Sequence, residues 1–200
     1  MILKFINYAF FDGEYDNKLI NIKKALNEDL NFFYKSDPAI KNKEEIIYYN
    51  QGFLAIICYR LANYYLNNNE YLLAKKISNY AYSKTSIDIN PKACIGIPFF
   101  IDHGCGCVIG ETTKIGNNVK IYHGVTLGAI SVAKENDKKR HPTIGDNVTI
   151  YANATILGNI NVGDNSLIGA NCFIFKSIKA NKKVYYKSKI VIKKRILKKD

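Results

Sequence analysis

Aliphatic residues recur at every sixth position through the second half of the chain. The longest unbroken series comprises Ile144, Ile150, Ile156, Val162, Ile168 and Ile174, and shorter series precede it at Ile109, Ile115, Ile121 and Leu127 and at Ile89, Ile95 and Ile101. A period of six fits neither the 3.6-residue repeat of a helix nor long strands joined by tight turns. It is typical of short parallel strands stacked into a solenoid, where each coil buries its aliphatic residue against the neighbouring coils. The sequence therefore predicts a hexapeptide-repeat β-helix over residues 87–178.

The region before residue 87 has a helical pattern. Steps of three and four separate its first apolar residues, as in an amphipathic helix: Leu19, Ile22, Leu26, Leu30 and Phe33. Asp37-Pro38 should end this helix, because the residue before a proline avoids the α conformation. A second helix is expected from Glu44 to Leu66 and a third from Tyr71 to Ser83. The chain is thus of mixed class, with a helical region at 1–86.

The formal charge of +12 is concentrated at one end of the chain. Residues 176–200 hold eleven Lys and Arg against one acid, Asp200, so the rest of the chain is nearly neutral. We interpret residues 179–200 as a basic tail, either simply solvated or able to attract phosphates such as those of a nucleotide. Neither a nucleic acid nor a membrane is an expected partner. No apolar stretch approaches the roughly 18 residues of a membrane span, and residues 1–11 lack a signal peptide's basic segment, so we expect a cytoplasmic protein.

The five cysteines do not indicate a disulfide framework or a zinc ribbon, because their number is odd and no C-x-x-C pair occurs. Cys172 falls at a small-residue position of the six-residue register and is expected to pack in the core. Cys105 and Cys107 are most simply explained as buried structural thiols. We predict no metal site.

The six-residue register is interrupted twice. Eight residues separate Ile101 from Ile109, which indicates a bulge, and seventeen separate Leu127 from Ile144, which indicates a loop at 128–142. Packing alone requires neither interruption, and such positions commonly carry function. His103 lies in the bulge and His141 in the loop, which points to a site.

The residues in these interruptions suit an amino-acid substrate. His103 can act as a general base on a hydroxyl or amine, and Asp88, one coil upstream, can orient its imidazole. Asp102 can bind an ammonium group, and Arg140, beside His141, offers a fork for a carboxylate. A base, an acidic pocket and a carboxylate clamp together indicate an amino acid with a hydroxyl to activate.

Simpler structural roles compete with these assignments. His123 follows a core isoleucine by two positions, and we interpret it as an ordinary outward-facing residue. His141 precedes Pro142 and can merely finish a turn, whereas Glu111 faces solvent or pairs with one of the histidines.

Seven short motifs over roughly residues 30–180 resemble serine O-acetyltransferases. In the β-helical part they are Phe100-Ile101-Asp102-His103-Gly104, Val108-Ile109-Gly110-Glu111-Thr112, Gly124-Val125-Thr126-Leu127-Gly128 and Arg140-His141-Pro142. In the helical part they are Ser36-Asp37-Pro38-Ala39-Ile40, Gly52-Phe53 and Tyr59-Arg60. Asp-His in the bulge combined with Arg-His-Pro after the loop is specific to this family rather than to hexapeptide proteins in general.

The resemblance implies a left-handed parallel β-helix and a homotrimer with its active sites between neighbouring subunits. It also implies transfer of acetyl from acetyl-CoA to the hydroxyl of L-serine, which gives O-acetylserine for cysteine biosynthesis. L-Cysteine is then an expected feedback inhibitor. No metal takes part.

The family's roles carry over position by position. The resemblance makes His103 the general base, Asp88 its orienting partner and His141 a second site histidine. It assigns the serine ammonium to Asp37 and Asp102 and the carboxylate to Arg140. It places the pantetheine of acetyl-CoA against backbone near Gly128, Ala152 and Ala170.

Three features depart from the family pattern. The helical region is shorter than in members that join two trimers, so a dimer of trimers does not follow from the resemblance. The loop is longer, and Ala129 replaces a glycine in it. The C-terminal segment Leu197–Asp200 lacks the terminal isoleucine by which members dock into O-acetylserine sulfhydrylase, so we do not expect that complex.

Three other functions stay open. The first is a hexapeptide acetyltransferase acting on another hydroxyl or amine, such as a sugar or xenobiotic, which would not need both Asp37 and Arg140. The second is a zinc hydratase, although the three histidines lack the close pair expected of its ligands. The third is a scaffold that binds anionic partners through its basic tail.

Overall fold

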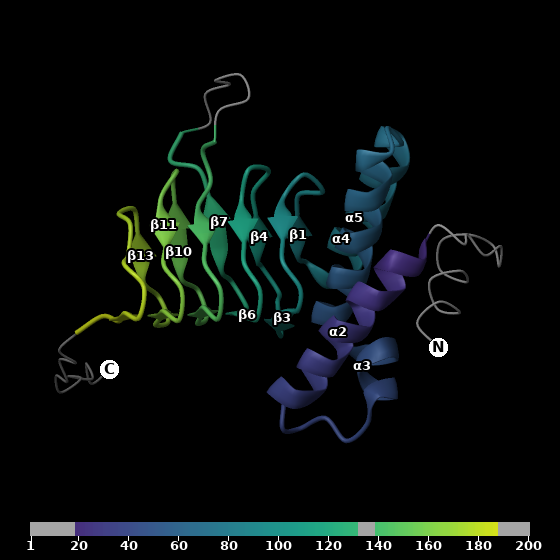
Figure 1. The fold of residues 1–200 in the computed structure, drawn as a ribbon, viewed down its shortest axis with the longest axis horizontal. Coiled ribbons are helices and arrows are strands. Elements are labelled where there is room, and N and C mark those ends of the chain that lie inside the picture. Colours follow the sequence, from purple (N-terminus) through teal and green to yellow (C-terminus); the bar gives the residue numbers. More distant parts are fainter. Residues whose placement is uncertain (1–18, 132–138, 188–200) are drawn as a thin grey trace, which may run out of the picture.

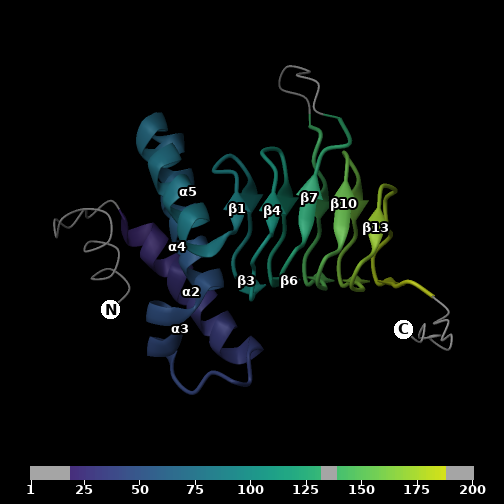
Figure 2. The same cartoon turned by 180° about the vertical axis from the view of Figure 1, so that it is seen from behind.

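A computed structural model describes residues 19–131 and 139–187. Helices form one end of the molecule, and a solenoid of short strands extends from them toward the C-terminal end (Figures 1 and 2). The helical region and the β-helix expected from the sequence are therefore both confirmed.

The helical region contains α2 (Ile20–Ser36), α3 (Lys43–Tyr49), α4 (Gln51–Asn67) and α5 (Tyr71–Thr85). The expected single helix from Glu44 to Leu66 is wrong, because Asn50 interrupts it with an extended backbone at φ −86° and ψ 113°. The Asn50 side chain then accepts a hydrogen bond from Phe53 N at 2.9 Å and caps α4. Over the ranges described, none of the helices has the length and apolarity needed to cross a membrane.

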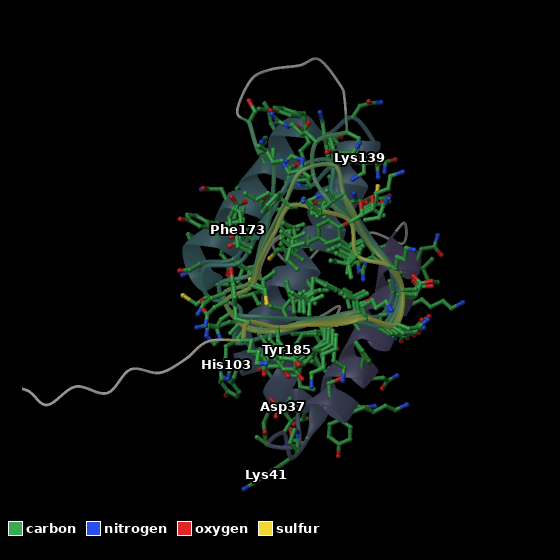
Figure 3. All side chains as sticks on the ribbon, turned by 90° about the vertical axis from the view of Figure 1, so that its left-hand side faces the viewer. Asp37, Lys41, His103, Lys139, Phe173 and Tyr185 are labelled. Atoms are coloured by element: carbon green, nitrogen blue, oxygen red, sulfur yellow. The ribbon has the colours of Figure 1, made fainter. Side chains whose placement is uncertain are left out.

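The solenoid has three parallel sheets, which enclose the triangular outline seen along its axis in Figure 3. Sheet A contains β1 (Asp88–Ile89), β4 (Val108–Ile109), β7 (Thr126–Gly128), β10 (Thr155–Leu157) and β13 (Phe173–Ile174). Sheet B contains β2 (Cys94–Ile95), β5 (Lys114–Ile115), β8 (Thr143–Ile144) and β11 (Asn161–Val162). Sheet C contains β3 (Phe99–Asp102), β6 (Val119–Tyr122), β9 (Thr149–Ile150), β12 (Leu167–Ile168) and β14 (Lys183–Val184).

The six-residue register sets the interior of the solenoid. Its aliphatic residues stack in register between coils, as Ile101, Ile121 and Ile150 do along sheet C, and all three are fully buried. Cys172 is buried as expected. Solenoid pairing continues to Val184 in β14, beyond the expected boundary at residue 178.

Asparagines turn the corner between sheets B and C. Asn118, Asn147, Asn165 and Asn181 all have φ between 56° and 59°, in the left-handed region that asparagine tolerates better than most residues. Their side chains also join successive coils, with Asn147 Nδ2 donating to Asn165 Oδ1 at 3.1 Å.

A buried ion pair fastens the helices to the first coil. Arg60 of α4 donates through Nε and Nη2 to the Asp29 carboxylate of α2, at 3.0 and 3.1 Å. Arg60 also donates to the carbonyls of Ile95 and Gly96, both at 2.8 Å, and Asp29 accepts from Phe99 N at 2.9 Å. Burial raises the pKa of Asp29, and the guanidinium opposes this rise. The pair therefore fixes the start of β3, the strand that ends at Asp102.

Gly52 allows α4 to pack directly against the same strand. A Cβ at this position would lie 2.2 Å from the carbonyl oxygen of Ile101, far inside van der Waals contact. Glycine is needed here for the close approach of helix and strand rather than for its backbone angles.

Candidate active site

The candidate site residues occupy two different corners of the solenoid. Chain segments passing from sheet C to sheet A form what we call the His103 corner, at residues 103–107, 123–125, 151–154 and 169–172. Segments passing from sheet A to sheet B form the His141 corner, at residues 110–113, 129–131, 139–142 and 158–160. Figure 3 shows them well apart, with His103 below and Lys139 near the top. The His103 corner lies at the beginning of the strands of sheet A, and the His141 corner lies at their end. One chain therefore does not bring its two groups of site residues together.

His103 projects from the end of β3 into solvent. Its φ of 58° is left-handed, and its side chain is 77% exposed. Nε2 lies 3.9 Å from Oδ1 of Asp102, whose side chain is 26% exposed. An exposed imidazole beside a carboxylate is well placed to meet a substrate hydroxyl next to an ammonium group.

Asp88 lies at the same corner, at the start of β1, where its backbone N–H donates to Cys107 O at 2.9 Å. Its side chain is exposed. Within the described part of the chain, no hydrogen bond joins the Asp88 carboxylate to His103, so its orienting role stays a prediction.

Asp37 follows the C-terminus of α2 and comes near the same corner. Its Oδ1 accepts from Ala39 N at 2.9 Å, and Figure 3 shows Asp37 below His103. Burial, Asp102, Tyr151 and Asp37 all raise the pKa of Tyr122, so both aspartates lie within electrostatic range of one tyrosine. The two expected ammonium ligands thus converge from separate parts of the sequence.

An aromatic pair extends this corner along sheet C. The rings of Tyr122 and Tyr151 stack with centroids 5.1 Å apart, and Tyr122 pairs in register with Asp102. The stacked rings therefore lie next to Asp102 in the following coils of sheet C.

Thr112 organises the His141 corner. Nδ1 of His141 accepts from Thr112 N at 3.1 Å and lies 2.8 Å from Thr112 Oγ1. The backbone N–H groups of Arg140 and His141 in turn donate to Thr112 Oγ1, at 3.0 and 3.1 Å. Because Nδ1 accepts a backbone hydrogen bond, the neutral ring carries its proton on Nε2.

The Lys139 side chain fixes the end of the loop at 128–142 by hydrogen bonds to backbone carbonyls. Its ammonium donates to the carbonyls of Thr112 at 2.8 Å, Pro142 at 3.1 Å and also His141. Burial lowers the pKa of Lys139, and nearby Lys114 lowers it further. This half-buried charge ties the segment that carries Arg140 to the neighbouring coil.

Glu111 pairs with cations rather than simply facing solvent. Its carboxylate lies 2.7 Å from Lys92 Nζ and 3.7 Å from Arg140 Nη2. The hydrogen bond from Lys92 lowers the pKa of Glu111. In this chain Glu111 is therefore an ion-pair partner of Arg140, whose carboxylate-binding role stays a prediction.

The three backbone positions expected to hold pantetheine also divide between the corners. Ala152 and Ala170 stack in adjacent coils at the His103 corner, where Asn171 N donates to Ala152 O at 2.9 Å. Gly128 is the last residue of β7 and lies next to the His141 corner. These assignments stay predictions.

Comparison with known proteins agrees with this architecture. Residues 141–176 match the family model described as bacterial transferase hexapeptide (six repeats). A serine acetyltransferase from Helicobacter pylori is 48% identical over 118 residues, which cover 59% of this chain and 67% of that protein.

The chain belongs to the serine acetyltransferase family.

Solved structures of the family extend the likeness to the helices. Serine acetyltransferase 1 of Entamoeba histolytica, crystallised with L-cysteine, superposes with a TM-score of 0.80 at 45% identity, covering 84% of this chain and 64% of that one. A serine acetyltransferase of Brucella abortus in complex with coenzyme A gives 0.78 at 34% identity, covering 91% and 68%. The left-handed β-helix implied by the resemblance is thereby confirmed. Matching segments span only 44–67% of the lengths of the curated serine acetyltransferases.

His123 lies against His103, a contact that the sequence did not predict. Its ring meets that of His103 edge to face, with centroids 6.1 Å apart and an interplanar angle of 76°. The register contained the signal, since Ile101 pairs with Ile121 and the residues two positions later therefore stack at one corner. Cys105, expected to be buried, is exposed at this corner, whereas Cys107 is buried.

In this chain, His141 should make stability depend on pH. Burial, followed by Arg140 and Lys139, lowers the pKa of His141. The unfolded chain, with an ordinary histidine pKa of about 6.5, then binds the proton more readily than the folded chain, so stability is lost as the pH falls below about 6.5. We expect the melting temperature to fall more between about pH 7.5 and 5.5 in the wild type than in His141→Asn, which keeps an acceptor for Thr112 N. Equal falls in the two proteins would contradict this role.

Proposed function

We propose that this protein is a serine O-acetyltransferase that moves the acetyl group of acetyl-CoA to the hydroxyl of L-serine, giving O-acetyl-L-serine for cysteine biosynthesis. The observation that carries the proposal is the His103 corner, where an exposed imidazole lies 3.9 Å from the Asp102 carboxylate. Family membership supports the same reaction, and Arg140 supplies a guanidinium for the amino-acid carboxylate.

The His103 corner suits direct attack by serine on the thioester. His103 takes the hydroxyl proton as the oxygen attacks, and this general-base role contributes about 10²–10⁴-fold. Asp37 and Asp102 hold the ammonium, which fixes the hydroxyl beside the imidazole. Holding both reactants in line is worth up to about 7–11 kcal/mol of the barrier.

We further propose that the complete site forms between neighbouring subunits of a homotrimer. The separation of the two corners across sheet A supports this, because Arg140 and His141 lie where the chain passes from sheet A to sheet B, whereas His103 lies where it passes from sheet C to sheet A. A neighbouring copy can bring its His141 corner against the His103 corner of the first. Approach of a substrate carboxylate would then release Arg140 from Glu111, which lies 3.7 Å away.

Acetyl-CoA is the proposed acetyl donor, and the bound coenzyme A in the Brucella abortus relative supports this choice. The division of Gly128 from Ala152 and Ala170 between the two corners supports a pantetheine that lies between subunits, with its thioester beside His103. The basic tail would meet the nucleotide end as a phosphate-binding segment, and its part at 188–200 lies outside the described residues.

Thiol release from acetyl-CoA tests the proposal. We expect release that depends on L-serine and is much slower with sugars, xenobiotic hydroxyls or amines. Faster turnover with one of those acceptors would instead favour a hexapeptide acetyltransferase of another specificity. Thiol release that does not increase when L-serine is added would refute the assignment.

L-Cysteine should compete with L-serine, because the two share the ammonium and carboxylate and differ only in sulfur for oxygen. The complex of the Entamoeba histolytica relative with L-cysteine supports this expectation. Steady-state kinetics should show an increased KM for serine and an unchanged kcat at saturating serine. Asp102→Asn should weaken cysteine inhibition and serine binding together, and purely noncompetitive inhibition against serine would contradict a shared pocket.

A further inference from the structure

His123 is placed by the fold directly beside the proposed general base. It follows β6 as His103 follows β3, and the two strands pair in register, so the imidazoles belong to successive coils of one corner. Their edge-to-face contact at 6.1 Å puts a second histidine ring within reach of any group bound at His103.

The two ring nitrogens of His123 lie in different surroundings. Nδ1 is buried and has no hydrogen-bond partner among the described residues. Orphaned buried N–H groups are rarer in proteins than under-satisfied acceptors, so we assign the proton of the neutral ring to Nε2. Nε2 of this half-buried side chain is the nitrogen left to reach the surface, and it does so as a hydrogen-bond donor.

The glycine amides nearest His103 and His123 are committed to backbone carbonyls. The amides of Gly104, Gly106 and Gly124 donate to the carbonyls of Asp102, Ser86 and Cys105, at 2.6, 2.9 and 2.9 Å. These three amides do not face an oxyanion at the His103 corner, whereas the His123 side chain offers a donor there.

We propose that Nε2–H of His123 donates a hydrogen bond to the thioester oxygen as it becomes an oxyanion, which makes His123 a catalytic residue of the acetyl transfer. The inference rests on the proposed function. The serine oxygen forms a bond to the carbonyl carbon, the carbonyl electron pair moves onto oxygen, and the hydroxyl proton passes to His103. The intermediate then collapses, the C–S bond breaks, and the CoA sulfur leaves as a thiol with the proton that His103 returns.

The separation of the rings suits these two roles. A general base needs its nitrogen about 2.6–3.2 Å from the hydroxyl oxygen, and an oxyanion donor needs about 2.7–3.1 Å to the developing charge. The rings of His103 and His123 are in contact, with centroids 6.1 Å apart, so a carbonyl bound at the surface of the corner can meet one nitrogen from each ring. The edge-to-face arrangement also lets the two nitrogens address different atoms of that group.

Two substitutions separate the donor from the ring. His123→Phe keeps an aromatic ring against His103 but removes the donor, and His123→Gln removes the ring but retains an amide N–H close to the position of Nε2. We expect His123→Phe to lower kcat by about 10²–10³-fold with little change in either KM, as for loss of one oxyanion donor. His123→Gln should recover activity to within about tenfold of the wild type. The melting temperature of His123→Phe should be at least that of the wild type, since the unpaired buried Nδ1 is gone.

The outcomes are distinguishable from failure of the proposed function. Wild-type turnover with L-serine and its loss in His103→Ala test the function itself. Near-normal kcat in His123→Phe, with wild-type turnover intact, would overturn the donor role and leave His123 as a packing residue. Equal losses in the Phe and Gln variants would also overturn it, because a donor at Nε2 must be rescued by the amide.

Discussion

His103→Ala is expected to lower kcat by about 10²–10⁴-fold while leaving the fold and the subunit assembly intact. The side chain is 77% exposed, so its removal opens no cavity in the core. The bulge that carries it lies outside the six-residue register, and packing does not depend on it. Thiol-release kinetics with L-serine and saturating acetyl-CoA measure the loss.

His103→Asn provides a matched control for the backbone, because asparagine tolerates the left-handed conformation at φ 58°. Both variants should melt and sediment like the wild type. Retention of more than about a tenth of the wild-type kcat in either variant would remove His103 from the general-base role. Loss of activity together with loss of assembly would instead assign it a structural role.

Arg60→Met is expected to lower the free energy of unfolding by about 3–5 kcal/mol, the usual cost of leaving one partner of a buried pair uncompensated. Asp29 is fully buried, and Arg60 is 9% exposed. Without the guanidinium, the Asp29 carboxylate keeps only its hydrogen bond from Phe99 N, and the carbonyls of Ile95 and Gly96 lose their donor. Denaturant unfolding of the assembled protein, at matched protein concentrations, measures the change.

Asp29→Asn combined with Arg60→Met tests the physical reason. The double variant has no buried charge, and its amide oxygen can still accept from Phe99 N. It should therefore be more stable than Arg60→Met alone. A double variant as unstable as the single one would show that the lost donors to Ile95 and Gly96, rather than the bare carboxylate, dominate the cost.

The sequence by itself determined the solenoid and supplied most of the candidate site residues. A six-residue period leaves few ways to bury Ile121 and its equivalents, because each coil needs one aliphatic residue per face. Departures from that period are visible in sequence for the same reason, and they pointed to His103 and His141. The helix end before Pro38 was equally local, since it follows from the backbone restriction that proline imposes.

Only the tertiary structure decided which of these residues meet. Asp29 and Arg60 join α2 to α4 and to the first coil, and nothing local in the sequence marks them as a pair. The ring contact between His123 and His103 depends on how two successive coils stack. The hydrogen bonds from Lys139 to backbone carbonyls likewise depend on the neighbouring coil. The break at Asn50 is different, because it comes with a local interaction, the cap that the Asn50 side chain places on α4.

The physical reason is the range of the interactions. Periodicity, proline and left-handed turns act within a few residues, so they can be read along the chain. Ion pairs, ring contacts and hydrogen bonds to distant carbonyls depend on how coils and helices stack, and sequence spacing does not specify them. The two corners show this most clearly. The sequence supplied both groups of candidate site residues, and the three-sided solenoid placed them at opposite ends of the strands of sheet A.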